Sequence, residues 1–496
     1  MNLARIIEGH PADRVAIFSR GKPTTYGQLC DQVAHVRGGL AALGVAKGDR
    51  VALLCGNGRY FAELYLAALG LGAVTVPLNP SSPAPEIERE LRTVGAKVVV
   101  VEPAAAHAWS QINRTGLAAV EHVVATEPKT VEGADCLFDE LLRAEQAPIA
   151  ELETDDLAVL IFTSGTAGSP RAAMLSHGNL LSNLDQSRST DGIMAGDVVY
   201  GVLPLFHIFG LNVVLGLSLA RGATVVLVQR FDPFTALETI RDRAVTVVPG
   251  APPLWVAFSQ FDDAPADSFA NVRLALTGAA KMPEEAARRL QERFGMSLLE
   301  GYGLTEASPV VTSSAGMEVK LGSVGKVLDG IQVRLVDENG DDALKGDSGE
   351  ILVKGPNVFM GYLDAPEATA RALTADGWLR TGDIAVADDD GYLYLVDRAK
   401  DLVIVSGVNV YPAEVEQVLL DHPDVAEVGV VGVPHPHTGE AVKAFVVLKP
   451  GAGAHEDSLV SWCLDNLARY KCPTKVVFVD ELPRNVSGKL LRRSLV

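Results

Sequence analysis

Short apolar runs alternate with segments of helical spacing along most of the chain. Residues 50–55, RVALLC, predict a strand, residues 58–72 have apolar side chains at helical spacing, and residues 74–79 predict another strand. The same pattern predicts further strands at 96–102, 224–229 and 243–250. Strands that are apolar along their whole length are usually covered on both faces, as in parallel sheets joined by crossover helices. We therefore expect an α/β fold in which parallel-rich sheets are flanked by helices.

The pattern changes near residue 330. Residues 331–356 alternate apolar and polar positions around Asn339-Gly340, which indicates an antiparallel hairpin and a small β-barrel-like subdomain. Residues 391–407 then predict two strands separated by a charged break, and the remainder predicts a small α+β unit. We place the domain boundary at this break, with an N-terminal domain at 1–397 and a C-terminal domain at 402–496. The motifs at 396–401 and 484–489 resemble those of a known family, and this resemblance implies that 398–401 is a hinge and that the C-terminal domain is mobile.

Composition narrows the classes of function. The 496 residues are 48% hydrophobic and 21% charged, which is typical of a folded soluble protein. The chain has 43 Lys and Arg against 62 Asp and Glu, a net charge of −19. Nucleic-acid backbones bind Lys and Arg and repel carboxylates, so we expect no nucleic-acid partner. A polyanionic ligand must then be held by a few local cations and by backbone N–H groups.

The cysteines and the apolar segments indicate in which cellular compartment the protein is expected. The five cysteines are scattered and none forms a CxxC pair, so neither a disulfide framework nor a zinc site is predicted. The most apolar long segment, 211–228, is interrupted by Asn212 and Arg221, so no transmembrane segment is predicted. We expect a cytoplasmic protein. Peripheral contact with a membrane stays open, as does the choice between a monomer and a homodimer.

A loop rich in glycine and hydroxyl groups follows the apolar run at 157–163. It reads Ser164-Gly165-Thr166-Ala167-Gly168 and is followed by the cation Arg171, a composition that suits a bound phosphate. The Walker pattern requires a Lys-Ser or Lys-Thr pair that this segment lacks. The segment is therefore a candidate phosphate loop of another type.

Seven segments occur together in one order along the chain. They are TSGTAGSPRA (163–172), PLFHIFG (204–210), GYGLTE (301–306), GWLRTGD (377–383), VDRAKD (396–401), SGVNVYPAEVE (406–416) and RNVSGK (484–489). With these segments the chain resembles the adenylate-forming (AMP-binding) superfamily of acyl-CoA synthetases, nonribosomal peptide adenylation domains and luciferases. Within it, the chain is most similar to acyl-CoA synthetases. The resemblance implies that an acid is activated by ATP to acyl-AMP, with release of pyrophosphate, before a thiol accepts the acyl group.

The resemblance implies a phosphate and magnesium site. The residues that would hold the β- and γ-phosphates are Thr163, Ser164, Gly165, Thr166, Ala167, Gly168 and Arg171. Family members usually carry Thr, Lys and Gly where this chain has Ala167, Arg171 and Ala172. Arg keeps the charge and can bind two phosphate oxygens, whereas the added methyl of Ala172 restricts the backbone. Glu306 and Thr166 would bind Mg²⁺, because this ion prefers hard oxygen donors.

A second set of residues would hold the nucleoside. Tyr302 would lie against the adenine, Asp383 would accept hydrogen bonds from both ribose hydroxyls, and Arg398 would donate to the ribose or a phosphate. The resemblance assigns the rest of the ATP and AMP site to Gly278, Ala279, Ala280, Gly301, Gly303 and Thr305.

Lys489 is the catalytic lysine that the resemblance implies. Its flexible ammonium would contact the carboxylate and the α-phosphate as adenylation occurs. It lies in the C-terminal domain, so it reaches the site only when that domain closes. Lys400 matches the family hinge, where backbone rotation swings the small domain between two poses. In the second pose Ser406 and Gly407 would face the acyl-adenylate, with Gly407 leaving room for the pantetheine arm of CoA; an ordinary strand-end turn is the alternative for Gly407.

Thr305, Glu306 and His207 complete the catalytic candidates. His207 lies between apolar neighbours, and a pocket-wall or gating role is favoured over a general base because the substrate carboxylate is already ionised. Amino-acid-activating relatives carry FDxS where this chain has FHIF, so an amino acid is not the expected substrate.

The segments expected to line the acyl pocket are apolar. They are 206–217, 248–258 and 301–311, and none contains the Arg or Lys that would pair with a second carboxylate. We expect a medium- to long-chain fatty acid to be joined to CoA with ATP and Mg²⁺. An aryl acid as substrate, and a carrier-protein phosphopantetheine as acceptor, stay open as alternatives. A regulator that only binds nucleotide is disfavoured, since Glu306, Asp383, Arg398 and Lys489 are all present.

Overall fold

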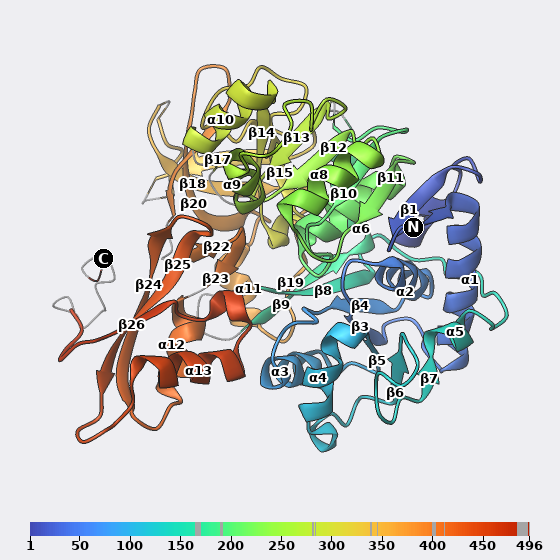
Figure 1. Ribbon diagram of the computed structural model, residues 1–496, viewed down its shortest axis with the longest axis horizontal. Coiled ribbons are helices and arrows are strands. Elements are labelled where there is room, and N and C mark those ends of the chain that lie inside the picture. The colour runs from blue at the N-terminus through green and yellow to red at the C-terminus, as the bar shows by residue number, and fades with distance from the viewer. Residues whose placement is uncertain are drawn as a thin grey trace.

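Among the residues that it describes, the computed structural model contains four sheets arranged in a large N-terminal part and a smaller C-terminal part (Figure 1). In Figure 1 the C-terminal part, orange to red, lies at the left of the molecule. The residues that the structure describes are 1–163, 170–188, 192–279, 282, 284–337, 340–344, 346–398, 403–410, 412–483 and 495. This arrangement confirms the α/β class with a large sheet-containing domain followed by a small one.

The first large sheet has eight strands in the order β19-β9-β8-β4-β3-β5-β6-β7. Its strands are β3 (Arg50–Leu54), β4 (Val74–Pro77), β5 (Val98–Val101), β6 (His122–Ala125), β7 (Cys136–Leu137), β8 (Leu157–Thr163), β9 (Arg171–Ser176) and β19 (Gly361–Tyr362). Helices α2 (Arg59–Gly70), α3 (Ala84–Val94) and α4 (Pro103–Gln111) lie between them in sequence. Strands β3 to β8 are parallel, and every residue of β4 and β5 is buried. The uniformly apolar runs are therefore interior parallel strands, as expected.

The second large sheet has nine strands in the order β16-β15-β14-β13-β12-β10-β11-β1-β2. Its strands are β1 (Val15–Ser19), β2 (Lys22–Thr25), β10 (Val198–Gly201), β11 (Thr224–Leu227), β12 (Val247–Gly250), β13 (Leu274–Thr277), β14 (Leu298–Gly303), β15 (Val310–Ser313) and β16 (Lys326–Val327). The remaining helices up to residue 294 are α1 (Tyr26–Ala42), α5 (Phe138–Leu141), α6 (His177–Gln186), α7 (Ser218–Ala220), α8 (Pro233–Asp242), α9 (Pro252–Gln260) and α10 (Glu284–Phe294). Of these, α5 contacts β7 and α6 contacts β9 of the eight-stranded sheet. The segment Phe209–Leu217 is wound as a π-helix, a conformation that is frequent at functional sites.

A four-stranded antiparallel sheet follows, and it is the subdomain that was expected to be barrel-like. It contains β17 (Gln332–Val336), β18 (Gly349–Lys354), β20 (Leu379–Ala387) and β21 (Leu393–Arg398), with α11 (Pro366–Ala372) between β18 and β20 in sequence. The expected hairpin pairs β17 with β18, but Val336 lies opposite Glu350, so the connection is much longer than an Asn-Gly turn. Near Gly340 the chain reverses direction, and a single bridge joins Val336 and Asp342 across this turn.

The C-terminal sheet contains β22 (Val403–Val405), β23 (Val408–Val410), β24 (Val425–His435), β25 (Gly439–Leu448) and β26 (Lys475–Phe478). Helices α12 (Pro412–Leu420) and α13 (Glu456–Asn466) pack with it around a separate core that includes Val415, Val430 and Leu459. β21 belongs to the four-stranded sheet and β22 to this one, so the chain changes sheets between residues 398 and 403. The expected hinge falls there. Lys400 lies outside the described residues, and the hinge and domain boundaries stay predictions.

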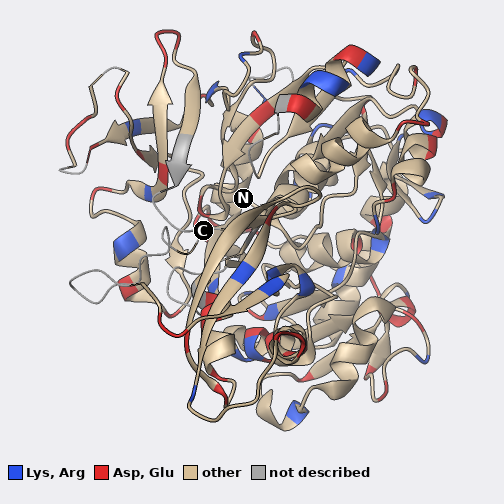
Figure 2. Cartoon of the chain, turned by 60° about the vertical axis from the view of Figure 1, so that its left-hand side comes forward, with Lys and Arg blue, Asp and Glu red and all other residues tan. Residues whose placement is uncertain are grey.

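Charged residues of both signs are spread over helices and loops rather than gathered in one basic stripe (Figure 2). Within the described part of the chain, no helix is long and apolar enough to cross a membrane. The cytoplasmic location and the oligomeric state stay predictions.

Candidate active site

A cavity of about 880 Å³ lies where the two large sheets, the four-stranded sheet and the C-terminal domain meet. Ligands of open parallel sheets bind at the carboxyl ends of strands, and β8, β13 and β14 end at this cavity. The predicted site residues that line it are Thr163, Arg171, His207, Gly278, Ala279, Gly301, Tyr302, Gly303, Thr305, Glu306, Asp383 and Gly407. Residues spread over about half of the sequence are thus brought together.

Several predicted site residues are outside the part of the chain that the structure describes. They are Ser164, Gly165, Thr166, Ala167, Gly168, Ala280, Lys400 and Lys489. Arg398 is described for its backbone, which pairs with Asp383 across β20 and β21. The roles of these residues stay predictions.

The phosphate end of the cavity is built on the hairpin of β8 and β9. Thr163 lies opposite Arg171 in the antiparallel register, at the point where the candidate phosphate loop leaves β8. Ala172, which departs from the family pattern, is buried within β9 opposite Phe162. Its added methyl group is therefore accommodated in a regular strand beside the loop.

Tyr362 connects the cation and the carboxylate at this end. Its hydroxyl donates to Oε1 of Glu306 at 2.6 Å, and the guanidinium carbon of Arg171 lies 5.8 Å from the centre of its ring. Tyr362 is on β19, opposite Ala173 of β9, and Glu306 is on a short 3₁₀ turn, Thr305–Ala307. The sequence analysis missed Tyr362, because its contact with Glu306 spans 56 positions and depends on the pairing of β19 with β9.

We expect Tyr362→Phe to raise the KM for ATP about ten- to hundredfold, because a hydrogen bond to a charged group is worth about 1.5–3 kcal/mol. The KM for the acid should change little. Pyrophosphate release with ATP varied measures the effect. Tyr394→Phe is a matched control, since its hydroxyl also donates to a carboxylate, Asp388, away from the cavity. Equal effects of the two substitutions would contradict the role of Tyr362.

The nucleoside end of the cavity contains a tyrosine–aspartate pair. The Tyr302 hydroxyl donates to Oδ2 of Asp383 at 2.7 Å, and the Tyr302 side chain is largely buried on β14. Gly278 and Ala279 line the same region, and a Cβ at Gly278 would lie 3.3 Å from the Phe209 ring. Ala279 has φ of +69°, a left-handed conformation that is uncommon for alanine and costly enough to suggest a functional role.

His207 begins the acyl branch of the cavity, at the start of the π-helix. Its Nδ1 accepts a hydrogen bond from the Phe209 amide at 3.3 Å. Desolvation by its surroundings lowers the pKa of His207 to about 4, so the imidazole is neutral near pH 7. A neutral ring with so low a pKa is a weak base, and it suits the wall or gate role.

Apolar side chains line the acyl branch beyond His207. They are Ile193, Phe206, Ile208, Phe209, Val213, Leu217, Val310 and Leu328. The prediction that 248–258 lines this pocket is wrong. Trp255 and Phe258 are buried in the core, where the Trp255 indole donates to the Leu276 carbonyl at 3.1 Å. An apolar run can line a ligand pocket or pack in the core, and the sequence alone did not distinguish the two.

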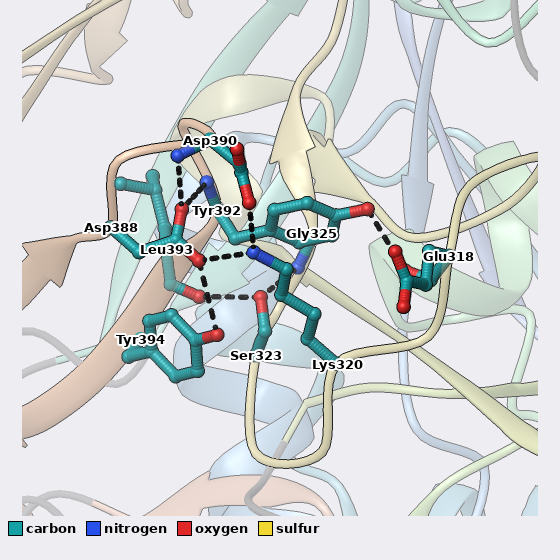
Figure 3. A network of polar contacts seen from close by, with 9 residues as sticks. All are labelled: Glu318, Lys320, Ser323, Gly325, Asp388, Asp390, Tyr392, Leu393 and Tyr394. Atoms are coloured by element: carbon teal, nitrogen blue, oxygen red, sulfur yellow. Dashed lines mark hydrogen bonds and ion pairs between the residues drawn. The ribbon is translucent and has the colours of Figure 1, made fainter.

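The segment 314–325 forms a further wall that the sequence analysis did not identify. Ala315, Gly322 and Val324 of this segment line the cavity. Lys320 fastens the segment to the β20–β21 hairpin by contacts of 2.7 Å to Asp388 and 2.6 Å to Asp390 (Figure 3).

Further contacts support this attachment. The Lys320 ammonium also lies over the Tyr392 ring, and the Tyr392 hydroxyl donates to the Glu318 carbonyl at 2.9 Å (Figure 3). The hydrogen bond from Lys320 lowers the pKa of Asp388 to about 2. This wall of the cavity is therefore held by the hairpin whose second strand leads to the expected hinge.

The C-terminal domain reaches the cavity through the turn between β22 and β23. Ser406 and Gly407 have φ of +53° and +81°. A Cβ at Gly407 would lie 2.6 Å from the Cβ of Ala251 and 3.7 Å from that of Ala279. Gly407 is thus both a strand-end turn and a close approach to the N-terminal domain. A smaller cavity of about 290 Å³, lined by α9, Gly407 and the β24–β25 turn, adjoins it.

Comparisons with known proteins agree with this geometry. The family model described as AMP-binding enzyme matches residues 3–363, and the model described as AMP-binding enzyme C-terminal domain matches residues 414–489. A feruloyl-CoA synthase from an Amycolatopsis species is 37% identical over 479 residues, which cover 96% of this chain and 94% of the relative.

Two further relatives differ in the acid that their names carry. A long-chain-fatty-acid–CoA ligase from Bacillus subtilis is 33% identical over 521 residues, covering 98% of this chain and 91% of the relative. The solved structure of a double mutant of o-succinylbenzoate CoA synthetase from Bacillus subtilis, bound with a product analogue, matches with a TM-score of 0.87 and 32% identity. That match covers 99% of this chain and 97% of the solved chain.

Proposed function

This chain belongs to the AMP-binding enzyme family, and from that membership we propose that it is an AMP-forming acid–thiol ligase. It joins a carboxylic acid to ATP, giving acyl-AMP and pyrophosphate, and then transfers the acyl group to CoA with release of AMP. The observation that carries the proposal is one cavity lined by the Arg171–Tyr362–Glu306 group, the Tyr302–Asp383 pair and the Gly407 turn. The two-step reaction requires sites for a nucleotide and an activated acid and an approach for a thiol, and these three groups suit those needs.

In the first step, a substrate carboxylate oxygen attacks the α-phosphorus and the bond to pyrophosphate breaks. Both reactants are anions, so the site must neutralise charge and align the attacking oxygen. Arg171 supplies a cation at the phosphate end, while Tyr302 and Asp383 hold the nucleoside. Lys489 is proposed to stabilise the charge that develops at the α-phosphate.

The donor set at the phosphate end fits Mg²⁺. The Glu306 carboxylate and the Thr163 and Thr305 hydroxyls all line this part of the cavity, and Mg²⁺ prefers such oxygen donors together with phosphate oxygens. We propose that Glu306 binds the ion, with Thr166 as a further donor. When bound, Mg²⁺ would neutralise phosphate charge, and Tyr362 would keep the Glu306 carboxylate oriented.

In the second step, the CoA thiolate attacks the acyl carbonyl and the bond to AMP breaks. The position of Gly407 against Ala251 and Ala279 supports this role, since the turn reaches the cavity without a side chain. The adjoining 290 Å³ cavity gives a route from outside along the face between the two domains.

For the acid, we propose a medium- to long-chain fatty acid. The acyl branch continues past His207 along the π-helix to Leu217, and its walls are apolar side chains. An aryl acid is the second candidate, because Phe206 and Phe209 line the branch entrance and a relative at 37% identity is named for an aromatic acid.

A pyrophosphate-release screen over fatty and aryl acids, run with and without CoA, tests the proposal. We expect release with ATP and one class of acid, and the corresponding acyl-CoA when CoA is added. Adenylation without any thioester would point to a carrier-protein acceptor. Absence of release with every acid would contradict the proposed activity.

Arg171→Ala should raise the KM for ATP about ten- to hundredfold and weaken inhibition by pyrophosphate, because a charge-assisted hydrogen bond to phosphate is lost. Arg171→Lys should recover much of the affinity, since a point charge still attracts phosphate. Steady-state kinetics with ATP varied measures this. An unchanged KM for ATP with a raised KM for the acid would place Arg171 at the other substrate.

A further inference from the structure

A lysine of the C-terminal domain binds a glutamate of the N-terminal domain. Lys471 Nζ lies 2.7 Å from Oε1 of Glu86 on α3 and 3.0 Å from Oε1 of Glu414 on α12. The backbone amide of Ala468 donates to Oε2 of Glu86 at 2.7 Å. Both oxygens of one N-terminal carboxylate are therefore bound by the C-terminal domain. Figure 1 shows α13, which precedes Ala468, beside α3.

These charged side chains are almost fully buried. Their exposed side-chain fractions are 2% for Glu86, 2% for Glu414 and 6% for Lys471. A buried charge that loses its partner is strongly destabilising, whereas the matched pair is tolerated. Separation of the domains would remove both partners of Glu86 and expose it to water, so this network exists only in the docked arrangement.

Glu90 adds a third carboxylate to the same site. It lies one helical turn after Glu86 on the buried face of α3. Its pKa is raised to about 8, first by burial and then by the charge of Glu86, while Lys471 and Arg89 lower it and Glu414 raises it further. Tyr470, which precedes Lys471, is also near this group. Burial and the neighbouring carboxylates therefore favour the protonated form of Glu90 while the domains are docked.

The network and the Gly407 turn hold one domain at two separate places. Gly407 approaches Ala251, which follows β12 of the nine-stranded sheet, whereas Lys471 binds α3, which follows β4 of the eight-stranded sheet. Glu86, Lys471 and Gly407 all line the 880 Å³ cavity. Two contacts at separate places around one cavity fix the orientation of the C-terminal domain.

We propose that Glu86, Glu414 and Lys471 form an interdomain docking site that positions the C-terminal domain for transfer of the acyl group to the thiol. They are positioning residues, because they act through the placement of the Gly407 turn. This inference rests on the proposed two-step reaction. It adds that the second step depends on a buried ion pair between α3 and the segment after α13.

Glu86→Gln and Lys471→Met test the site. We expect thioester formation from supplied acyl-AMP and CoA to fall about tenfold or more, with pyrophosphate release from acid and ATP within about twofold of the wild type. The double variant should be little worse than either single variant, because both remove one interaction. Glu88→Gln is the matched control on the same helix, where Glu88 pairs with Arg92, and it should leave both steps unchanged.

The pH dependence of the transfer rate distinguishes a docking role of this network from a purely structural role, which would leave that dependence unchanged. In the docked arrangement burial and the charge of Glu86 raise the pKa of Glu90 to about 8, and Glu414 of the C-terminal domain raises it further, so docking favours uptake of a proton. This contribution of Glu90 to docking is present while Glu90 is protonated and is lost as the pH rises through about 8. The ratio of the wild-type transfer rate to the Glu90→Gln transfer rate should fall as the pH rises through this value. Taking the ratio removes the effect of thiol ionisation, because that effect is the same for both proteins.

Small-angle scattering tests docking without the chemistry. Lys471→Met should increase the radius of gyration, and Glu88→Gln should not. An equal loss of both half-reactions, or unchanged transfer with unchanged scattering, would overturn the docking site. Failure of the proposed function gives a different result, because the wild type would then release no pyrophosphate with any acid. The difference in radius of gyration between the wild type and Lys471→Met would still report the contact.

Discussion

Lys489→Ala is expected to lower acyl-AMP formation about a hundred- to a thousandfold while largely sparing thioester formation from supplied acyl-AMP. Adenylation creates negative charge around the α-phosphate, and a positioned ammonium stabilises that charge only as the reaction proceeds. The thiol step has no such charge at phosphorus. Lys489 lies outside the described residues, and its proposed role rests on the motif RNVSGK at 484–489.

The two half-reactions are measured separately. Pyrophosphate release reports the first, and acyl-CoA formation from synthetic acyl-AMP reports the second. Lys475→Ala is a suitable control, because Lys475 is an exposed lysine of the same domain on β26. An equal loss of both half-reactions in Lys489→Ala would refute the assignment.

Gly407→Ala is expected to have the opposite selectivity, with transfer to CoA strongly reduced and adenylation retained. The added Cβ would lie 2.6 Å from the Ala251 Cβ, and alanine at φ of +81° is strained. The clash costs about 1–3 kcal/mol in the docked arrangement, which corresponds to a fall in transfer of about fivefold to a hundredfold. The backbone strain lowers the stability of the domain in either arrangement. Adenylation would be spared because the strained contact with Ala251 belongs to this arrangement.

Gly451→Ala separates the two costs. Gly451 is in the same domain at φ of +79°, with no atom within 4 Å of an added Cβ among the described residues. It carries the backbone strain without the clash, so it should leave both half-reactions near the wild-type rates and lower only the stability. A similar loss of transfer in both variants would show that strain, and not the approach to Ala251, limits the step.

Local patterns predicted much of the fold. The strand runs at 50–55 and 74–79 became β3 and β4, and the helical spacing between them became α2, because side-chain periodicity follows directly from backbone geometry. The connection between β17 and β18 was less predictable. Its turn near Gly340 is local, whereas the pairing of Val336 with Glu350 depends on the packing of the whole sheet.

The candidate site was predictable where the family motifs contain its residues. Arg171, Glu306 and Asp383 were named from the family motifs that contain them, and all three line one cavity. Their chemical types suit a phosphate, a magnesium ion and a ribose, and these roles stay predictions. Tyr362 was missed, and 248–258 was wrongly placed in the acyl pocket. The sequence around a tyrosine does not show which distant side chain its hydroxyl binds, and an apolar run does not show which cavity it faces.

By itself, the sequence determined the α/β architecture, the family and the residue types that an adenylating site requires, because periodicity and short motifs are properties of neighbouring residues. The tertiary structure alone decided which side chains meet. The Tyr302–Asp383 hydrogen bond spans 81 positions and the Glu86–Lys471 contact spans 385. Contacts of that range arise only when separate sheets pair and a second domain docks, and no local pattern encodes that geometry.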